Sequence, residues 1–383
     1  KFDFDWKFIL DDKKEYAQKS FIDTHWENIQ VPHDWSIKLK FDKSVGGASA
    51  FIPGGIGWYR KSFTVPTSYQ DKKVSILFDG IMHQSDVYIN GHHLGFHPYG
   101  YSSIEYDLTP YLKFYEENVI AVRVDRTGKS ARWYTGSGIY RHVWLQVVNP
   151  IHVSTYGTYI TTPSVSIEKA DVKIVTTLKN DDVKEQNVSV SHRVLNTSGK
   201  EIAKSKVGKI ILNRNDSTFS LSKPELWSIE TPVLYTMETT VKVGNKVVDV
   251  YATPFGVRTI KFDKDKGFFL NGKHIKLKGL CLHQDAGSMG VAVPDKVDER
   301  RLKILKEYGC NAIRCAHNQP TPEFLDMCDR MGFVVIDEAF DKWRSGYYEK
   351  HYDEWWKKDL GNMIIRDRNH PSIILWSYGN EVA

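Results

Sequence analysis

The sequence predicts a multidomain protein: a β jelly-roll sandwich, then an immunoglobulin-like β-sandwich, then the first half of a (β/α)8 TIM barrel. Its length of 383 residues exceeds what one hydrophobic core usually serves, which favours several domains. Short strand patterns without helical periodicity fill the first two-thirds of the chain. From about residue 260, strand and helix patterns alternate, as they do in α/β barrels.

The bulk composition excludes several classes of function. The chain is 41% hydrophobic and 26% charged, as in ordinary globular proteins. Its net charge of +5 comes from scattered lysines, whereas a nucleic-acid partner would require a clustered basic face. No apolar run approaches the roughly 18 residues that a membrane-spanning helix needs. We therefore expect neither a nucleic-acid partner nor a membrane association.

Residues 1–150 are predicted to form the jelly-roll sandwich. Apolar and polar residues alternate over short segments such as 74–78, 86–89 and 119–124. Turn signals such as the Asn-Gly pair at 90–91 separate these segments, and no helical period intervenes. Many short strands with regular turns are typical of a sandwich or jelly roll.

Metal-binding patterns are weak throughout the chain. The first domain contains four histidines close in sequence, namely His83, His92, His93 and His97. His92 and His93 point to opposite faces of an extended strand, and no carboxylate or thiol completes a ligand set. The four cysteines Cys281, Cys310, Cys315 and Cys328 contain no CxxC pair, so we expect buried free thiols. The sequence thus predicts no metal site from these residues.

Residues 151–258 are predicted to form the immunoglobulin-like sandwich. Strand patterns at 172–176, 188–190 and 247–250 alternate cleanly between apolar and polar residues. Such alternation indicates sheets with one wet face and one buried face. No cluster of reactive side chains occurs here, so we expect this domain to act as a spacer that fixes the geometry of its neighbours.

Residues 259–383 are predicted to form the first four βα units of the barrel. The expected strands lie at 275–282, 311–316, 333–336 and 373–376, and the expected helices at 295–308, 322–331 and 353–367. Thr321 followed by Pro322 is a typical start of a helix, and Gly309 and Gly332 end two of them. The last strand, apolar on consecutive positions, is expected to be buried on both faces.

Polar side chains follow each of these four strands. They are His283 after the first strand, Arg314 and His317 at the second, Glu338 and Asp341 at the third, and Asn380 and Glu381 after the fourth. Parallel strands of a barrel present their carboxyl ends at one face, where such folds keep their chemistry. We therefore expect these groups to line one pocket.

The residue types in this pocket suit acid/base work on a polyhydroxylated substrate. Glycoside hydrolysis needs one carboxylic acid to protonate the leaving oxygen and a second carboxylate on the other side of the sugar ring. Glu381 is the candidate acid, and Asn380 beside it can donate a hydrogen bond to a sugar hydroxyl.

Three motifs resemble glycoside hydrolase family 2, which includes β-galactosidases, β-glucuronidases and β-mannosidases. The closing stretch, DRNHPS at 367–372 with WSYGNE at 376–381, is similar to the acid/base motif of that family. RCAH at 314–317 is similar to its second barrel-strand motif, and GSGIYR at 136–141 to its N-terminal sandwich. The resemblance covers the whole chain in the family's domain order.

The resemblance implies roles for particular residues. Glu381 would be the general acid/base and Asn380 would hold the sugar 2-hydroxyl. His283 and His317 would bind substrate hydroxyls, Arg314 would lie beside the nucleophile, and Asp125 of the first domain would reach the pocket rim. The implied activity is that of a retaining exo-β-glycosidase, with β-galactosidase favoured over β-glucuronidase. A non-catalytic carbohydrate-binding protein is the alternative from another class.

The sequence departs from the family pattern in two places. Some β-galactosidases of the family bind magnesium just past the third strand, but here Lys342 and Arg344 would repel a cation, so we expect no metal and no cofactor. Trp343, between them, is expected to stack on the sugar. The family's nucleophile, a glutamate near the end of the seventh strand, has no counterpart before Ala383.

This second departure leads to expectations about partners and location. We expect these residues to belong to a longer polypeptide, or to be held by a copy that covers the open barrel, because open sheet edges are unstable in water. The piece alone is expected to be inactive, and a homo-oligomer is compatible with the sequence. The chain begins at Lys1, and the resemblance to polysaccharide-degrading enzymes favours a periplasmic or secreted location, with a cytoplasmic one as the alternative.

Overall fold

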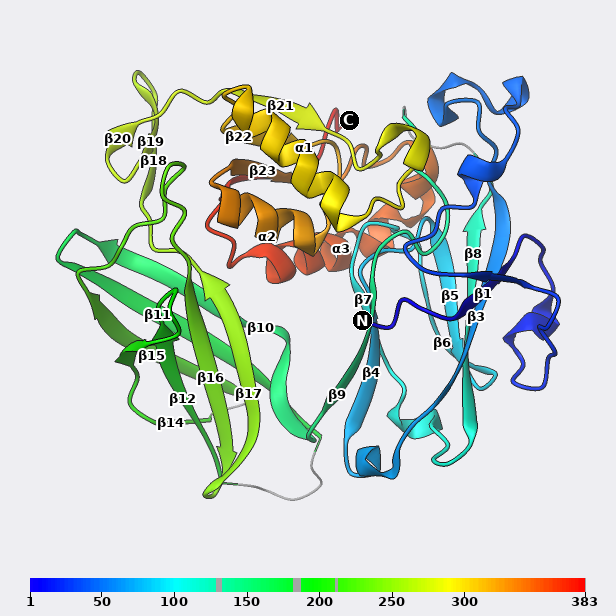
Figure 1. The fold of residues 1–383 in the computed structure, drawn as a ribbon, viewed down its shortest axis with the longest axis horizontal. Helices are drawn as coiled ribbons and strands as arrows, with labels where there is room; N and C mark the ends of the chain where they lie inside the picture. Colours follow the sequence, from blue (N-terminus) through cyan, green and yellow to red (C-terminus); the bar gives the residue numbers. More distant parts are fainter. Residues whose placement is uncertain (129–132, 182–186, 211–212, 383) are drawn as a thin grey trace.

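A computed structural model describes residues 1–128, 133–181, 187–210 and 213–382. Two β-sandwiches stand side by side, and a four-stranded sheet with its helices lies across one end of both (Figure 1). The predicted fold class is confirmed: a jelly-roll sandwich, an immunoglobulin-like sandwich and part of a TIM barrel follow one another along the chain.

The first domain packs a six-stranded antiparallel sheet against a three-stranded one. The larger sheet has the order β2-β1-β3-β8-β5-β6 and the smaller one the order β7-β4-β9. The strands are β1 Trp6–Ile9, β2 Glu27–Ile29, β3 Gly55–Thr64, β4 Lys73–Phe78, β5 Gln84–Ile89, β6 His92–His97, β7 Ile104–Asp107, β8 Glu117–Arg126 and β9 Val143–Val148. Apolar residues alternate inward along both sheets, and Tyr59, Ile76, Val87 and Val122 meet in the core between them.

The second domain has the same construction with different strand orders. Its sheets are β10-β11-β15 and β13-β12-β16-β17, with β14 paired to β12. The strands are β10 Ile151–Val165, β11 Lys169–Asn180, β12 Val188–Leu195, β13 Glu201–Lys204, β14 Gly208–Lys209, β15 Arg214–Ser222, β16 Tyr235–Val243 and β17 Lys246–Phe255. Val172, Ile174 and Met237 lie in the core between the sheets.

The third part begins with a small antiparallel sheet and continues as a parallel one. The small sheet contains β18 Ile260–Asp263, β19 Gly267–Leu270 and β20 Lys273–His274. The parallel sheet contains β21 Gly279–Leu282, β22 Ala312–Cys315, β23 Val334–Glu338 and β24 Ile373–Ser377, in that order. The helices α1 Asp295–Glu307, α2 Pro322–Met331 and α3 Tyr352–Asp367 alternate with these strands. Of the fourth predicted βα unit, the described residues contain the strand, β24.

Short 3-10 helices occupy several loops. They are Lys14–Ala17, Ser36–Lys38, Lys43–Val45, Gly47–Ser49, Thr67–Tyr69, Thr109–Tyr111, Gly287–Met289 and Gly346–His351. The last of them, η8, leads directly into α3. In the part of the chain that the structure describes, no helix combines the length and the hydrophobicity that crossing a membrane would require.

Three predictions about burial were wrong at the open edges of the parallel sheet. In β24, Ile373 and Ile374 are buried, but Leu375 is 40% exposed and Trp376 is 39% exposed. Cys281, expected to be buried, is exposed because β21 is the opposite edge strand. The faces of a parallel sheet are covered by the layers packed on them, and this cover is less complete at an edge strand, which has neighbouring side chains on one side only.

Buried polar contacts join the first domain to the barrel. Arg141, the last residue of the GSGIYR motif, is buried and donates 2.8 Å to the carbonyl of Gln319, which follows β22. It also donates to the carbonyls of Asp79 and Tyr101 in its own domain. Gly136, at the start of the motif, has a φ of +75°, and a Cβ there would lie 2.0 Å from the Val291 side chain. The motif therefore fixes how the first domain sits against the barrel.

The DRNHPS motif joins the barrel to the second domain. Asn369 donates to the carbonyl of Thr158 at 3.0 Å and accepts from the backbone N–H of Ile160 at 2.9 Å. The His370 ring lies 2.6 Å from the Asp329 carboxylate on α2. These contacts lie between α3 and β24, so they fix the position of the strand that leads to Asn380 and Glu381.

Candidate active site

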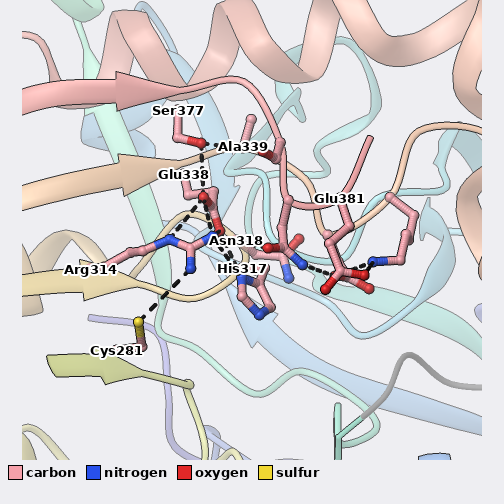
Figure 2. Close-up of polar contacts among 12 residues, drawn as sticks. Cys281, Arg314, His317, Asn318, Glu338, Ala339, Ser377 and Glu381 are labelled. Carbon is pink, nitrogen blue, oxygen red and sulfur yellow. Dashed lines mark hydrogen bonds and ion pairs between the residues drawn. The ribbon is translucent and has the colours of Figure 1, made fainter. Parts of the chain in front are cut away.

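The carboxyl ends of β22, β23 and β24 bring together the predicted residues Arg314, His317, Glu338 and Asn380. The parallel pairing places Arg314 of β22 opposite Ile336 of β23, and Glu338 opposite Ser377 of β24. The chain after β24 turns back over this edge, where the backbone N–H of Asn380 donates 2.7 Å to the carbonyl of Phe340. Side chains from three consecutive strands therefore converge on one place (Figure 2).

Glu338 is the centre of this cluster. Glu338 is 1% exposed, and its two carboxylate oxygens accept hydrogen bonds from groups on both neighbouring strands. Arg314 donates from Nε at 3.1 Å and from one terminal nitrogen at 2.9 and 2.8 Å. Nδ1 of His317 lies 2.8 Å from Oε1, and the Ser377 hydroxyl donates to Oε2 at 2.8 Å. Figure 2 shows Glu338 between the Arg314 and Ser377 side chains.

The charge state of Glu338 follows from these contacts. Burial raises the pKa of Glu338, but the hydrogen bonds from His317, Arg314 and Ser377 outweigh it and hold the pKa below its usual value. Burial lowers the pKa of Arg314, and the Glu338 carboxylate more than compensates, so that pKa is raised. The pair is therefore ionised, and its members satisfy each other's charge as a buried ion pair requires.

Asn380 is oriented from both sides of its amide group. Its Oδ1 accepts from Arg314 at 3.0 Å, and its Nδ2 donates to the Asp341 carboxylate at 2.9 Å. An amide nitrogen carries two hydrogens, so one remains to donate to a ligand. The structure thus places Asn380 with its amide in a fixed orientation, as a residue that grips a sugar hydroxyl requires.

Glu381 lies beside this cluster and faces solvent. Its side chain is 57% exposed, and Lys342 lies 3.1 Å from its Oε2. The same Lys342 ammonium is 3.3 Å from the Asp341 carboxylate. Glu381 is therefore in the predicted place at the end of β24, next to Asn380 and accessible to a substrate.

Two imidazoles and one indole form an aromatic wall beside the ion pair. The His283 and His317 rings lie 5.2 Å apart, centre to centre. The indole of Trp133 lies 4.4 Å from His283 and 5.4 Å from His317. Burial is the largest cause that lowers the pKa of His283, and a lowered pKa favours the neutral imidazole. Trp133 comes from the first domain, so the wall is shared between two domains.

Trp343 and Asp125 have surroundings that differ from this cluster. The Trp343 ring stacks on Tyr352 at 5.6 Å, and its indole N–H donates to the carbonyl of Tyr378. One face of Trp343 thus packs on an aromatic neighbour, and sugar stacking remains a prediction.

The Asp125 carboxylate accepts from Thr127 at 2.6 Å and lies 3.7 Å from Arg123. Those contacts stay within the first domain, and its reach to the pocket rim also remains a prediction.

The residues after β23 do not fit a divalent cation. The Lys342 ammonium lies 3.3 Å from the Asp341 carboxylate and 3.1 Å from the Glu381 carboxylate, so a positive charge already stands between the two oxygen ligands that a cation would need. Two other groups of potential metal ligands occur among the described residues: His142, Asp295 and Glu323, and Asp326, Asp329 and His370. In each group the histidine is already hydrogen-bonded to a carboxylate.

The sequence placed Glu338 in the pocket but did not indicate its central position, and it gave no sign that Trp133 and Tyr99 of the first domain reach the barrel. Glu338 is visible in the sequence as a strand-end carboxylate, but its central place depends on partners from β22 and β24. Trp133 precedes the GSGIYR motif, and nothing local relates it to His283 and His317, which follow 150 and 184 residues later. The Tyr99 hydroxyl of the first domain lies 2.5 Å from Oδ1 of Asn318 and also contacts the carbonyl oxygen of Ala339, so it touches two barrel loops. Nothing in the local sequence indicates this role of Tyr99.

Family models match nearly the whole chain. The sugar binding domain of glycosyl hydrolases family 2 matches residues 1–149, a second model of glycosyl hydrolases family 2 matches residues 151–258, and the TIM barrel domain of that family matches residues 262–383.

Individual relatives agree with these matches. The chain is 47% identical over its whole length to β-galactosidase BoGH2A of Bacteroides ovatus, of which it covers 46%. It superposes on a crystal structure of a β-glycosidase from Bacteroides vulgatus with a TM-score of 0.95 and 42% identity, covering 100% of this chain and 50% of that one. For a Bacteroides uniformis β-glucuronidase the TM-score is 0.87 and the identity 32%, covering 99% of this chain and 46% of that one. The chain spans about half the length of these relatives.

Proposed function

The chain belongs to glycosyl hydrolase family 2, and from this premise we propose that it carries the general acid/base of a retaining exo-β-glycosidase. The observation that supports the proposal best is the convergence of Arg314, Glu338 and Asn380 at the strand ends, with Glu381 beside them. This arrangement fixes the amide that would hold a sugar hydroxyl and leaves the neighbouring carboxyl group accessible.

The proposed reaction has two steps, in which Glu381 acts first as an acid and then as a base. In the first step, the protonated Glu381 gives its proton to the glycosidic oxygen while the bond from that oxygen to the anomeric carbon breaks. A second carboxylate forms a covalent bond to the anomeric carbon. In the second step, the Glu381 carboxylate takes a proton from water, whose oxygen displaces the second carboxylate and regenerates it.

Glu338 is not the second carboxylate in this proposal. Both of its oxygens are occupied by Arg314, His317 and Ser377, and the side chain is buried. A nucleophile needs an exposed lone pair directed at the anomeric carbon. We therefore assign the nucleophile to a barrel strand later than β24, in keeping with the family resemblance.

The substrate we favour is a terminal β-galactoside. The relative at 47% identity is named a β-galactosidase, and it shares the full length of this chain. The alternative is a β-glucuronide, whose carboxylate requires a cation. Near the site, Lys342 is paired with Asp341 and Glu381, and Arg344 is paired with Asp353 at 2.6 Å. Both cations thus already have carboxylate partners.

Paired substrates test the specificity. The protein that carries these residues should hydrolyse 4-nitrophenyl β-galactoside with a kcat/KM at least about tenfold above that for the β-glucuronide, a difference of about 1.4 kcal/mol. A kcat/KM that is higher for the β-glucuronide would identify the β-glucuronide as the substrate.

A Glu381→Gln variant tests the acid/base role. We expect kcat on a methyl or alkyl galactoside to fall by about 100-fold to 10,000-fold, because the leaving group is no longer protonated. A dinitrophenyl galactoside needs little protonation, so its first step should be much less affected, and added azide should accelerate the second step. Glu299→Gln, a surface carboxylate on α1 paired with Lys296 and Lys303, is the matched control. Unchanged turnover in Glu381→Gln would refute the assignment, and binding without turnover in the wild type would favour a carbohydrate-binding protein.

A further inference from the structure

Glu338 is a buried carboxylate in the middle of the site to which the proposed reaction gives no bond-making role. Its Oε1 lies 2.8 Å from Nδ1 of His317, while the opposite ring nitrogen of His317, Nε2, has no such contact with Glu338. The His317 side chain is 18% exposed, and its ring forms part of the aromatic wall with His283 and Trp133. A neutral imidazole carries a hydrogen on only one of its two nitrogens, and that choice decides whether Nε2 donates or accepts a hydrogen bond.

The contact with Glu338 determines which nitrogen of His317 carries the hydrogen. An ionised carboxylate only accepts hydrogen bonds, so a nitrogen 2.8 Å from it must carry a hydrogen. The alternative tautomer would place a nitrogen lone pair against a carboxylate oxygen at that distance, and two acceptors repel each other. Arg314 also lies 3.2 Å from Nδ1 of His317, but it can donate to that atom only in the disfavoured tautomer. Its hydrogens have better acceptors in Glu338 at 2.8 to 2.9 Å and in Asn380 at 3.0 Å.

We propose that Glu338 is a positioning residue that keeps a hydrogen on Nδ1 of His317, so that the lone pair of the neutral imidazole lies on Nε2, where it can accept from a substrate hydroxyl. The hydrogen bond made by one imidazole nitrogen sets the role of the other. The ligand at Nε2 is therefore a hydrogen-bond donor, and the chemical class it selects is a hydroxyl group. The kinetic part of this inference rests on the proposed glycosidase function, whereas the tautomer does not.

Two further contacts keep Glu338 in the orientation that this role requires. Ser377 donates to Oε2, and Arg314 spans both oxygens, so the carboxylate plane is fixed by groups on β24 and β22. Nearly complete burial prevents water from replacing the imidazole as a partner. The carboxylate is thus pre-organised before a ligand arrives, which is what a positioning residue must be.

The first experiment reads the tautomer directly. Protein labelled with ¹⁵N-histidine is examined at alkaline pH, where imidazoles are neutral, by a two-bond ¹H–¹⁵N correlation spectrum. The His317 signals are those missing in a His317→Gln variant. We expect the nitrogen shifts of the Nδ1–H tautomer. An Nε2–H pattern in the wild type overturns the proposal, whether or not any substituted protein folds.

Glu338→Gln provides the second arm, because it keeps the shape and reverses the hydrogen bond. The glutamine oxygen is expected to face Arg314 and Ser377, the side with more donors, so its NH2 faces His317 and donates to Nδ1. The His317 spectrum should then change to the Nε2–H pattern. Ser377→Ala is the matched control, since it removes one contact of Glu338 but leaves the contact with His317. It should keep the Nδ1–H pattern, and a change of tautomer in Ser377→Ala but not in Glu338→Gln contradicts the proposal.

Deoxyfluoro sugars provide a functional readout that a merely structural role would not move. Fluorine accepts weakly but cannot donate a hydrogen bond, so one of a series of monofluorinated galactosides should lose at least about tenfold in kcat/KM with the wild type. With Glu338→Gln, where Nε2 becomes a donor, the discrimination between that fluoro sugar and the parent sugar should shrink. Unchanged discrimination contradicts the proposal. Absence of any wild-type hydrolysis would count against the proposed glycosidase, while the spectra would still decide the tautomer.

Discussion

The indole of Trp133 lies 4.4 Å from the imidazole of His283, although the two residues belong to different domains. Trp133 is part of the jelly roll, and His283 follows the first strand of the barrel. The same indole lies 5.4 Å from His317. The first domain therefore contributes directly to the wall of the candidate site, beyond holding the barrel in position.

This relationship predicts a binding defect in Trp133→Ala. An aromatic contact is worth about 1 kcal/mol beyond burial, so KM for an aryl galactoside should rise about fivefold or more while kcat changes less. Trp133→Phe should retain part of the effect. Trp144→Ala is the matched control, because its indole is in the same domain but donates to Asp79. An unchanged KM in Trp133→Ala would show that the ring takes no part in binding.

Arg141 predicts a stability effect at the boundary between the first domain and the barrel. Its buried guanidinium donates to the carbonyls of Asp79, Tyr101 and Gln319. Arg141→Met keeps the aliphatic volume but leaves these acceptors without their donor, which should lower the free energy of unfolding by about 2–4 kcal/mol. Thermal unfolding of wild type and variant at one protein concentration measures the difference.

The control for this prediction is an exposed arginine. Arg193 pairs with Glu238 at 2.5 Å on the surface of the second domain. Arg193→Met should destabilise the protein much less than Arg141→Met does, because surface ion pairs contribute little. Equal destabilisation by both substitutions would mean that Arg141 is no more important than a surface contact.

Local patterns in the sequence predicted the elements of the barrel well. The helix from Pro322 begins where Thr321 was expected to cap it, and Gly332 ends it in the left-handed conformation. The strand-end polar groups Arg314, His317 and Asn380 were expected to converge, and the structure brings them together. Hydrophobic periodicity, capping and strand direction are local properties, so a single sequence contains them.

The features that were missed depend on neighbours that are remote in sequence. Leu375 is half-exposed because its strand is an edge, which no local pattern reveals. Glu338 obtains its partners from both neighbouring strands, and Trp133 from another domain. Periodicity cannot specify which elements will be adjacent in space.

The capping residue of α2 predicts a smaller, local stability effect. The Thr321 hydroxyl accepts from the backbone N–H of Phe324 at 3.1 Å, which satisfies one of the free donors at the helix start. Thr321→Ala should lower the free energy of unfolding by about 1 kcal/mol. Thr321→Ser keeps the hydroxyl and should stay close to the wild type. Equal loss in both variants would attribute the effect to the methyl group of threonine.

His142 predicts how stability depends on pH. Its ring lies 2.8 Å from Asp3 and 3.1 Å from Asp295. Burial lowers the pKa of His142, but hydrogen bonds and charge from Asp3, Glu323 and Asp295 outweigh it and raise the pKa from 6.5 to about 9. A pKa that is higher in the folded state means that protonation stabilises the fold.

The sign of this effect follows from the two pKa values. Stabilisation by protonated His142 is complete below the unfolded pKa of 6.5 and is lost as the pH rises through about 9. The unfolding temperature of His142→Gln should therefore lie furthest below that of the wild type under mildly acidic conditions, and the gap should narrow at alkaline pH. Subtracting the unfolding temperature of the variant from that of the wild type cancels the contributions of other groups that titrate in the same range. One such group is His370, whose pKa is also raised to about 9. A gap that stays constant across this range would mean that His142 contributes through packing and not through its charge.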